Sequence, residues 1–127
     1  MFKSVLIAAA DLFLADILCE RCKSLGLFAD VAFNAMSALE KIDEMEPDIV
    51  ILDVEMPYGN GLSVCEMMST HQQLSKIPVI ILTARSDRQT VRRCHELGAY
   101  YIIKECDVWP RIEPLIRELI ETSAAAI

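Results

Sequence analysis

Two kinds of hydrophobic periodicity alternate along the chain. Short apolar runs predict β-strands, and between them apolar positions three and four residues apart predict amphipathic helices. The predicted strands cover residues 3–9, 29–33, 48–53, 78–82 and 100–103, and the predicted helices cover residues 11–25, 35–45, 62–75, 87–97 and 110–121. Five strand–helix units with short connections predict one parallel sheet with helices on both faces, a three-layer α/β sandwich.

The third predicted strand ends in a carboxylate. Residues 49–52 are all large and apolar, Asp53 follows them, and a turn containing proline and glycine comes next. A continuous apolar run of this length is typical of a strand buried on both faces of a parallel sheet. Ligands of such sheets bind just beyond the carboxyl ends of the strands. Asp53 is therefore either an ordinary turn residue or a functional group at that edge.

Each predicted helix has a candidate inner face and most have a candidate cap. Asn34 is expected to cap the second helix, and either Ser86 or Asp87 the fourth. Pro110 suits the first turn of the last helix, whereas Pro114 is expected to delay or bend it. The predicted inward-facing residues are Leu14, Ile17, Leu18, Cys22 and Leu25, then Ala35, Ala38, Leu39, Ile42 and Met45, then Leu62, Cys65 and Met68 or Ser69, then Val91, Cys94 and Leu97, and finally Ile112, Leu115, Ile116, Leu119 and Ile120.

Composition narrows the functional classes. The 127 residues are 54% hydrophobic, which is enough for one domain with a substantial core. A formal net charge of −7, with no basic cluster larger than Arg92–Arg93, argues against direct binding to nucleic acid or an anionic membrane. No apolar run approaches the roughly 18 residues of a membrane helix, and the first apolar run is read as a strand rather than a signal peptide. We therefore expect a cytoplasmic protein.

The five cysteines are predicted to be reduced thiols that fill core space. Cys19 and Cys22 have the C-x-x-C spacing of redox and zinc sites, but they fall in the middle of a predicted helix. A thiolate is stabilised at a helix N-terminus rather than there, and no second Cys/His pair accompanies them. A redox or metal role for this pair is disfavoured.

Three strand ends carry complementary polar groups. Asp53 ends the third predicted strand, Thr83 follows the fourth and Lys104 follows the fifth. Each residue alone has an ordinary interpretation as a turn residue or a solvated charge. A carboxylate, a hydroxyl and an ammonium at the same edge of one sheet indicate a binding or reaction site.

Several segments together resemble the receiver domain of two-component response regulators. They are V-L-I-A at residues 5–8, I-L-D-V-E-M-P at 51–57, G-N-G-L at 59–62, P-V-I-I-L-T-A-R at 78–85 and E-L-G-A-Y-Y-I-I-K at 96–104. The resemblance covers essentially the whole chain. It implies a flavodoxin-like (βα)5 fold with strand order 2-1-3-4-5. It also implies a receiver domain over residues 1–121 and a short tail at 122–127.

The resemblance assigns roles to four residues. Asp53 is implied to be the phosphoacceptor, Thr83 the hydroxyl that turns toward the phosphoryl group, Lys104 the pocket lysine and Tyr101 the aromatic switch residue. Attack of an Asp carboxylate on a phosphoryl donor is covalent nucleophilic chemistry. The new charge of roughly −2 would draw Thr83 toward it and leave space for Tyr101. These roles describe a signalling domain rather than an enzyme.

The chain departs from the family pattern at the end of the first strand. Ala9 and Ala10 stand where the family has two acidic residues that hold Mg2+. The remaining candidate ligands are the Asp53 carboxylate and the backbone oxygen of Glu55, with Asp11 as a candidate substitute. Asp11 lies one position too far along and is expected to begin the first helix. The metal site is therefore expected to be impaired and any Mg2+ binding weak, because Asp53 and Lys104 already balance each other.

Two further positions differ from the usual pattern or suggest a contact. Glu55 and Arg85 stand two residues after Asp53 and Thr83, and they are candidates for an ion pair across the mouth of the pocket. Their ordinary interpretation is two solvated rim charges. Glu105 stands where the family usually has proline after the lysine, so the following loop is expected to be set differently.

Two functions of different class follow. The first is a phosphoacceptor domain, phosphorylated at Asp53 by a histidine kinase or phosphotransfer protein with weak or unusual metal dependence. The second is a degenerate pseudo-receiver that acts as a phosphorylation-independent interaction module. A third possibility is that the two alanines are not native residues. Signalling is expected through a downstream protein target, as a monomer or as a homodimer through the fourth helix, fifth strand and fifth helix. The chain is either a stand-alone receiver or part of a longer protein.

Overall fold

The protein folds around one five-stranded parallel sheet. The computed structural model describes residues 3–57, 59–84, 87–104 and 107–125. Strands β1 (Ser4–Ala8), β2 (Phe28–Ala32), β3 (Ile49–Asp53), β4 (Val79–Thr83) and β5 (Tyr100–Ile103) lie in the order β2-β1-β3-β4-β5. All four neighbouring pairs are parallel. The predicted flavodoxin-like fold is confirmed.

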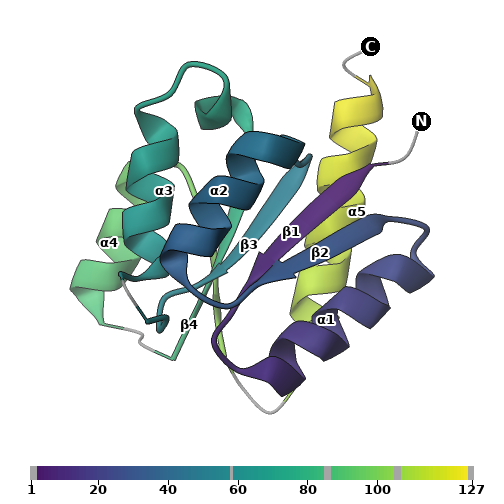
Figure 1. The fold of residues 1–127 in the computed structure, drawn as a ribbon, viewed down its shortest axis with the longest axis horizontal. Helices are drawn as coiled ribbons and strands as arrows, with labels where there is room; N and C mark the ends of the chain where they lie inside the picture. The colour runs from purple at the N-terminus through teal and green to yellow at the C-terminus, as the bar shows by residue number, and fades with distance from the viewer. Residues whose placement is uncertain (1–2, 58, 85–86, 105–106, 126–127) are drawn as a thin grey trace.

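Helices cover both faces of the sheet. They are α1 (Leu12–Ser24), α2 (Ala35–Met45), α3 (Gly61–Ser69), α4 (Arg88–Glu96) and α5 (Trp109–Ala125), with a short 3-10 turn, η1, at Leu74–Lys76. In Figure 1, α1 and α5 lie on one face of the sheet, and α2, α3 and α4 lie on the other. The strands β1 and β3 run toward the lower edge of that view, so the carboxyl ends of the parallel strands gather there.

The core has one half on each side of the sheet. Val50 and Leu52 pack with residues of α2, α3 and α4, whereas Ile49 and Ile51 pack with residues of α1 and α5. Every residue of β3 and β4 is buried. This explains the uninterrupted apolar run of the central strand, since a strand covered on both faces has no polar side.

Side-chain caps fix the starts of four helices. The carboxylate of Asp11 accepts hydrogen bonds from the first turn of α1, and Asn34, Asn60 and Asp87 cap α2, α3 and α4 in the same way. Asn34 was predicted. Of the two candidate caps for α4, Asp87 is the one that the structure shows, and Ser86 lies outside the described residues.

Three details differ from the sequence prediction. Ile17 is 51% exposed because the buried stripe of α1 runs through Ala15, Leu18 and Cys22. The third helix ends at Ser69 rather than between 71 and 75, and a separate 3-10 turn buries Leu74. The last helix continues through Pro114 and reaches Ala125, past the predicted end at residue 121. Within the described residues, no helix combines the length and the apolar character needed to cross a membrane.

Candidate functional site

The ends of β3, β4 and β5 come together at the carboxyl edge of the sheet. Asp53 is the last residue of β3, Thr83 the last residue of β4, and both are buried. The amide of Lys104 donates to the carbonyl oxygen of Thr83 at 2.8 Å, which extends the β4–β5 ladder by one step. Through this step the backbone brings Lys104 to the same edge as the other two residues.

The side chain of Lys104 lies between two carboxylates. Its ammonium nitrogen, Nζ, donates to Oδ1 and Oδ2 of Asp53 at 3.0 Å each, and it is also 3.0 Å from Oε2 of Glu55. The backbone N–H of Glu55 donates to Oδ1 of Asp53 at 3.0 Å. Asp53 is thus held by one cation and one backbone donor, and the same cation reaches Glu55 at the rim.

Burial and pairing shift the acidities of this pair. Burial raises the pKa of the Asp53 carboxyl, and the hydrogen bonds from Lys104 and from the Glu55 backbone only partly offset it. For Lys104, burial lowers the pKa, but the bonds to Glu55 and Asp53 outweigh it and leave the pKa raised. The lysine is therefore an ammonium at neutral pH, and it places a positive charge next to the buried Asp53 side chain.

The loop between β3 and α3 is packed against the backbone of Asp53. The amide of Gly61 donates to the carbonyl oxygen of Val54 at 3.2 Å. A Cβ atom at position 61 would collide with the carbonyl oxygen of Asp53 and lie 2.9 Å from its carbonyl carbon. The sequence showed a glycine-containing turn at this place, but only the fold shows that Gly61 supports Asp53.

The end of β1 brings no carboxylate to this edge from the two alanine positions. Ala9 is fully buried and Ala10 is exposed, and the amide of Ala9 donates to the carbonyl oxygen of Ala32. Oδ1 of Asp11 accepts hydrogen bonds from the amides of Phe13 and Leu14. Within the described ranges, no group of three or more His, Cys, Asp or Glu side chains is arranged to hold a metal ion.

Tyr101 lies on β5, next to α4. Its side chain is 45% exposed and lines an open groove of about 1090 Å³ with residues of α4, β5 and α5. The lining residues include Arg88, Val91 and Arg92. In the β4–β5 register Tyr101 pairs with Ile81, two residues before Thr83. The structure therefore places the predicted switch residue on the neighbouring surface, two strands away from Asp53, with β4 between them.

One contact at the site was missed by sequence reasoning. Glu55 was a candidate partner of Arg85 or else a solvated rim charge, and the structure pairs its carboxylate with Lys104. Arg85 lies outside the described residues, as does Glu105, so the expectations placed on these two positions stay untested. The sequence signal for this contact was the short spacing between Asp53 and Glu55, which lie two residues apart. A lysine side chain that reaches Asp53 can therefore also reach Glu55.

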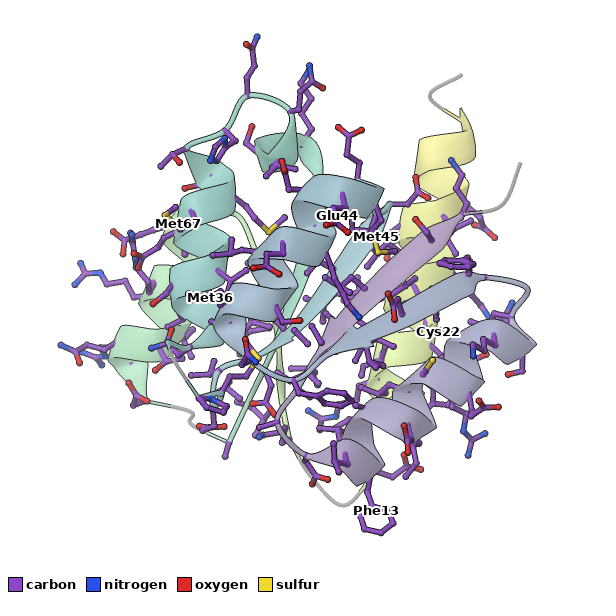
Figure 2. The ribbon with its side chains drawn as sticks, viewed as in Figure 1. Phe13, Cys22, Met36, Glu44, Met45 and Met67 are labelled. Atoms are coloured by element: carbon purple, nitrogen blue, oxygen red, sulfur yellow. The ribbon has the colours of Figure 1, made fainter. Side chains whose placement is uncertain are left out.

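Three of the four described cysteines are buried. Cys19, Cys22, Cys65 and Cys94 are free thiols, and Cys106 lies outside the described residues. Burial raises the pKa of Cys22 to about 12, so the second thiol of the C-x-x-C pair is protonated at neutral pH. Figure 2 shows Cys22 on α1. It is fully buried, as expected for a core residue.

Comparison with known sequences identifies bacterial relatives. The chain is 32% identical over 105 residues to the DNA-binding response regulator MtrA of Mycolicibacterium paratuberculosis, covering 82% of this chain and 45% of that protein. It is 40% identical over 73 residues to a protein-glutamate methylesterase/protein-glutamine glutaminase of Treponema denticola, covering 56% of this chain and 19% of that protein. The chain thus spans less than half the length of either relative.

Solved structures agree with the observed fold. The receiver domain of a DNA-binding response regulator from Colwellia psychrerythraea superposes with a TM-score of 0.86 at 28% identity, covering 94% of this chain and 98% of that one. A CheY-like receiver domain protein from Methanospirillum hungatei gives a TM-score of 0.86 at 20% identity, covering 98% and 99%. The second likeness shows the fold alone.

The family assignment rests on the match to the family model. The model of the response regulator receiver domain matches residues 5–108, from β1 to the residue before α5. This match includes Asp53, Thr83 and Lys104, whose geometry is described above. Because it covers most of the chain, the protein belongs to the response regulator receiver domain family of two-component signalling.

Proposed function

We propose that this receiver domain is a phosphoacceptor in a two-component phosphorelay and that Asp53 is the residue that is phosphorylated. The observation that carries the proposal is the Asp53–Lys104 pair, a buried carboxylate 3.0 Å from an ammonium at the open edge of the sheet. A buried carboxylate needs a partner, and a cation that is 24% exposed can turn toward an incoming phosphoryl group.

The proposed reaction is a single phosphoryl transfer. A carboxylate oxygen of Asp53 forms a bond to phosphorus, while the bond from phosphorus to the donor's leaving atom breaks and that atom keeps the electron pair. With a phosphohistidine donor the leaving atom is an imidazole nitrogen. Lys104 would neutralise part of the charge on the transferred group.

We infer that the Mg2+ site is impaired, because the residues at this edge do not fit the ion. Ala9 and Ala10 have no ligand atoms in their side chains, and Asp11 is engaged in capping α1. Both Asp53 oxygens accept bonds from Lys104. With both oxygens already paired with an ammonium and no acidic side chain at positions 9 and 10, the phosphoryl transfer proposed above uses no metal.

A second function is favoured by the same hydrogen bonds to the Asp53 carboxylate. Oδ1 of Asp53 accepts bonds from both Lys104 and the backbone of Glu55. An unphosphorylated site that is already satisfied is what a degenerate pseudo-receiver would need to keep one fixed conformation. In that case the domain would bind its partners without phosphorylation.

Partner surfaces are proposed on α1 and on the face made by α4, β5 and α5. Leu12, Phe13 and Ile17 are exposed on α1, and Figure 2 shows Phe13 projecting away from the fold. Exposed apolar side chains at the carboxyl edge suit a histidine kinase or phosphotransfer protein that must reach Asp53. The groove beside Tyr101 suits a downstream protein or a second copy. Movement of Thr83 and Tyr101 would connect the two surfaces.

The proposal is tested by measuring intact mass after incubation with phosphoramidate. The protein is compared with the Asp53→Ala variant, each with Mg2+ and with EDTA. We expect one phosphoryl adduct, absent from the variant and formed equally with EDTA. An adduct that requires Mg2+ would show that the metal site works, and the Asp11→Asn variant would then test Asp11 as a ligand. No adduct on the folded protein would leave the pseudo-receiver as the function.

A further inference from the structure

We propose that Glu55 restrains phosphorylation of Asp53 by competing for Lys104, and that the phosphoryl group displaces Glu55 when it arrives. Glu55 is then a positioning residue, which acts on the site through the lysine. This inference rests on the proposed function of Asp53 as a phosphoacceptor.

The distances show that one ammonium serves two carboxylates. Nζ of Lys104 is 3.0 Å from both Asp53 oxygens and 3.0 Å from Oε2 of Glu55. The Asp53 side chain is 3% exposed, whereas the Glu55 side chain is 41% exposed. Lys104 therefore spans from the buried nucleophile to the rim, and Glu55 occupies the solvent side of the ammonium, from which a donor would approach.

The backbone keeps Glu55 in this place. Its N–H is bonded to Oδ1 of Asp53, and the amide of Val54 donates to the carbonyl oxygen of Leu82 at 2.9 Å. Gly61 closes the other end of the loop on the carbonyl oxygen of Val54. The carboxylate is thus presented to Lys104 by a loop that is anchored on both β3 and β4.

The charges favour exchange of partners on phosphorylation. Before transfer, two carboxylates share one ammonium. The phosphoryl group replaces the single charge of Asp53 with a charge of roughly −2 and three strong acceptor oxygens. A half-exposed carboxylate is a weaker partner than these oxygens, because its solvation by water competes with the ion pair. Lys104 then turns to the phosphoryl group, and its ion pair with Glu55 is broken.

With phosphoramidate as the donor, the reaction is a transfer of the phosphoryl group from nitrogen to Asp53. An oxygen of Asp53 bonds to the phosphorus of phosphoramidate, and the phosphorus–nitrogen bond breaks. The nitrogen leaves with the electron pair as ammonia, since it is already protonated in the donor. Glu55 takes no part in these bonds, so its substitution leaves the nucleophile intact.

The first measurement compares phosphorylation rates of the wild type and the Glu55→Gln variant. The amide keeps the size of the side chain and removes its charge. We expect the variant to react about two- to fivefold faster, the range that corresponds to a half-exposed ion pair. Glu66→Gln is the matched control, because Glu66 has a similar exposure and its own ion pair with Arg93 at 3.1 Å on α3 and α4. This control is expected to react at the wild-type rate.

Two donors separate competition for the lysine from simple repulsion. Phosphoramidate is a singly charged anion at neutral pH, and acetyl phosphate is more highly charged. If Glu55 acts through Lys104, the acceleration in Glu55→Gln is the same with both donors. A larger acceleration with acetyl phosphate would show that Glu55 only repels anions, and it would overturn the proposal.

A double-mutant cycle tests the pairing without any donor. Glu55→Gln and Lys104→Gln are combined in an Asp53→Asn background, where no buried carboxylate is left without its cation, and urea unfolding is measured. We expect the two substitutions to be coupled, and additive effects would overturn the proposal. Equal rates of adduct formation on the wild type, Glu55→Gln and Glu66→Gln would refute this inference alone. Failure of all three of these proteins, which keep Asp53, to form an adduct would refute the phosphoacceptor function as well.

Discussion

The backbone of Gly61 lies directly against the backbone carbonyl group of Asp53. The space between them is too small for a side chain at position 61, although Gly61 does not have the positive φ that usually explains a glycine. The residue that begins α3 therefore also sets the position of the residue that ends β3.

Replacing Gly61 with alanine is expected to destabilise the domain and disturb the site. Separating the two backbones to make room for a methyl group should cost about 1–3 kcal/mol of unfolding free energy. It should also slow phosphorylation of Asp53, because the carboxylate moves relative to Lys104. Urea denaturation and intact mass measure the two effects.

The control for this variant is Gly26→Ala. Gly26 has a φ of 84°, and no atom lies within 4 Å of the place that a Cβ would take, so alanine there is strained but remote from the site. We expect a loss of stability with an unchanged rate of phosphorylation. If Gly61→Ala also left the rate unchanged, the proposed support of Asp53 by Gly61 would be wrong.

Replacing Lys104 with methionine is expected to make stability depend on pH. The substitution keeps most of the side chain but leaves the buried Asp53 carboxylate without its cation. We expect a loss of about 2 kcal/mol at neutral pH, below the usual cost of breaking a fully buried pair because Lys104 is partly exposed.

The sign of the pH effect follows from the direction of the pKa shift. Burial already raises the pKa of Asp53 above its ordinary value of 3.8, and loss of Lys104 raises it further. An acid with a raised pKa in the folded state stabilises the fold when protonated, and this contribution is lost as the pH rises through the raised pKa. The deficit of Lys104→Met should therefore shrink in acid. Asp53→Asn combined with Lys104→Met should recover stability at neutral pH, and a deficit that persists there would contradict the burial argument.

Restoring carboxylates at the end of β1 is expected to create Mg2+ binding. The variant Ala9→Asp/Ala10→Asp adds two hard oxygen ligands beside Asp53, and calorimetric titration should show affinity at least roughly tenfold above that of the wild type. Because Ala9 is fully buried, the new charge should lower the melting temperature without metal, and Mg2+ should restore it.

The matched control is Ala9→Asn/Ala10→Asn, which adds similar volume without charge. It should lose stability, and Mg2+ should not restore it. Equal Mg2+ affinity in the wild type and the aspartate variant would mean that the two alanines do not limit metal binding.

The fold was predictable because its signals are local and repeated. The apolar runs of β3 and β4, the cap at Asn34 and the spacing of the helix stripes each specify one element. The parallel sheet follows from the alternation of strands and helices, whereas the strand order was implied by the family resemblance. Ile17 was misplaced because α1 has apolar residues at neighbouring positions and so offers two stripes one position apart, and the contacts with the sheet select one.

The site was predictable only as far as strand ends indicate it. Asp53, Thr83 and Lys104 could be assigned to one edge from strand ends alone. The contact between Lys104 and Glu55 and the close approach of Gly61 depend on where a flexible side chain ends and how a loop closes. These are tertiary properties that spacing along the chain does not specify.

Pro114 is expected to lower the stability of α5. It is the sixth residue of the helix Trp109–Ala125, so it lacks the N–H that would donate to the carbonyl oxygen of Pro110. Pro114→Ala should restore this bond and raise the free energy of unfolding by about 2 kcal/mol. Pro110→Ala is the control, because Pro110 lies in the first turn, where its missing N–H costs little, and it should change stability only slightly. Thermal and urea unfolding measure both. If Pro114→Ala failed to stabilise the protein, the ring of Pro114 would have to contribute packing that compensates for the lost hydrogen bond.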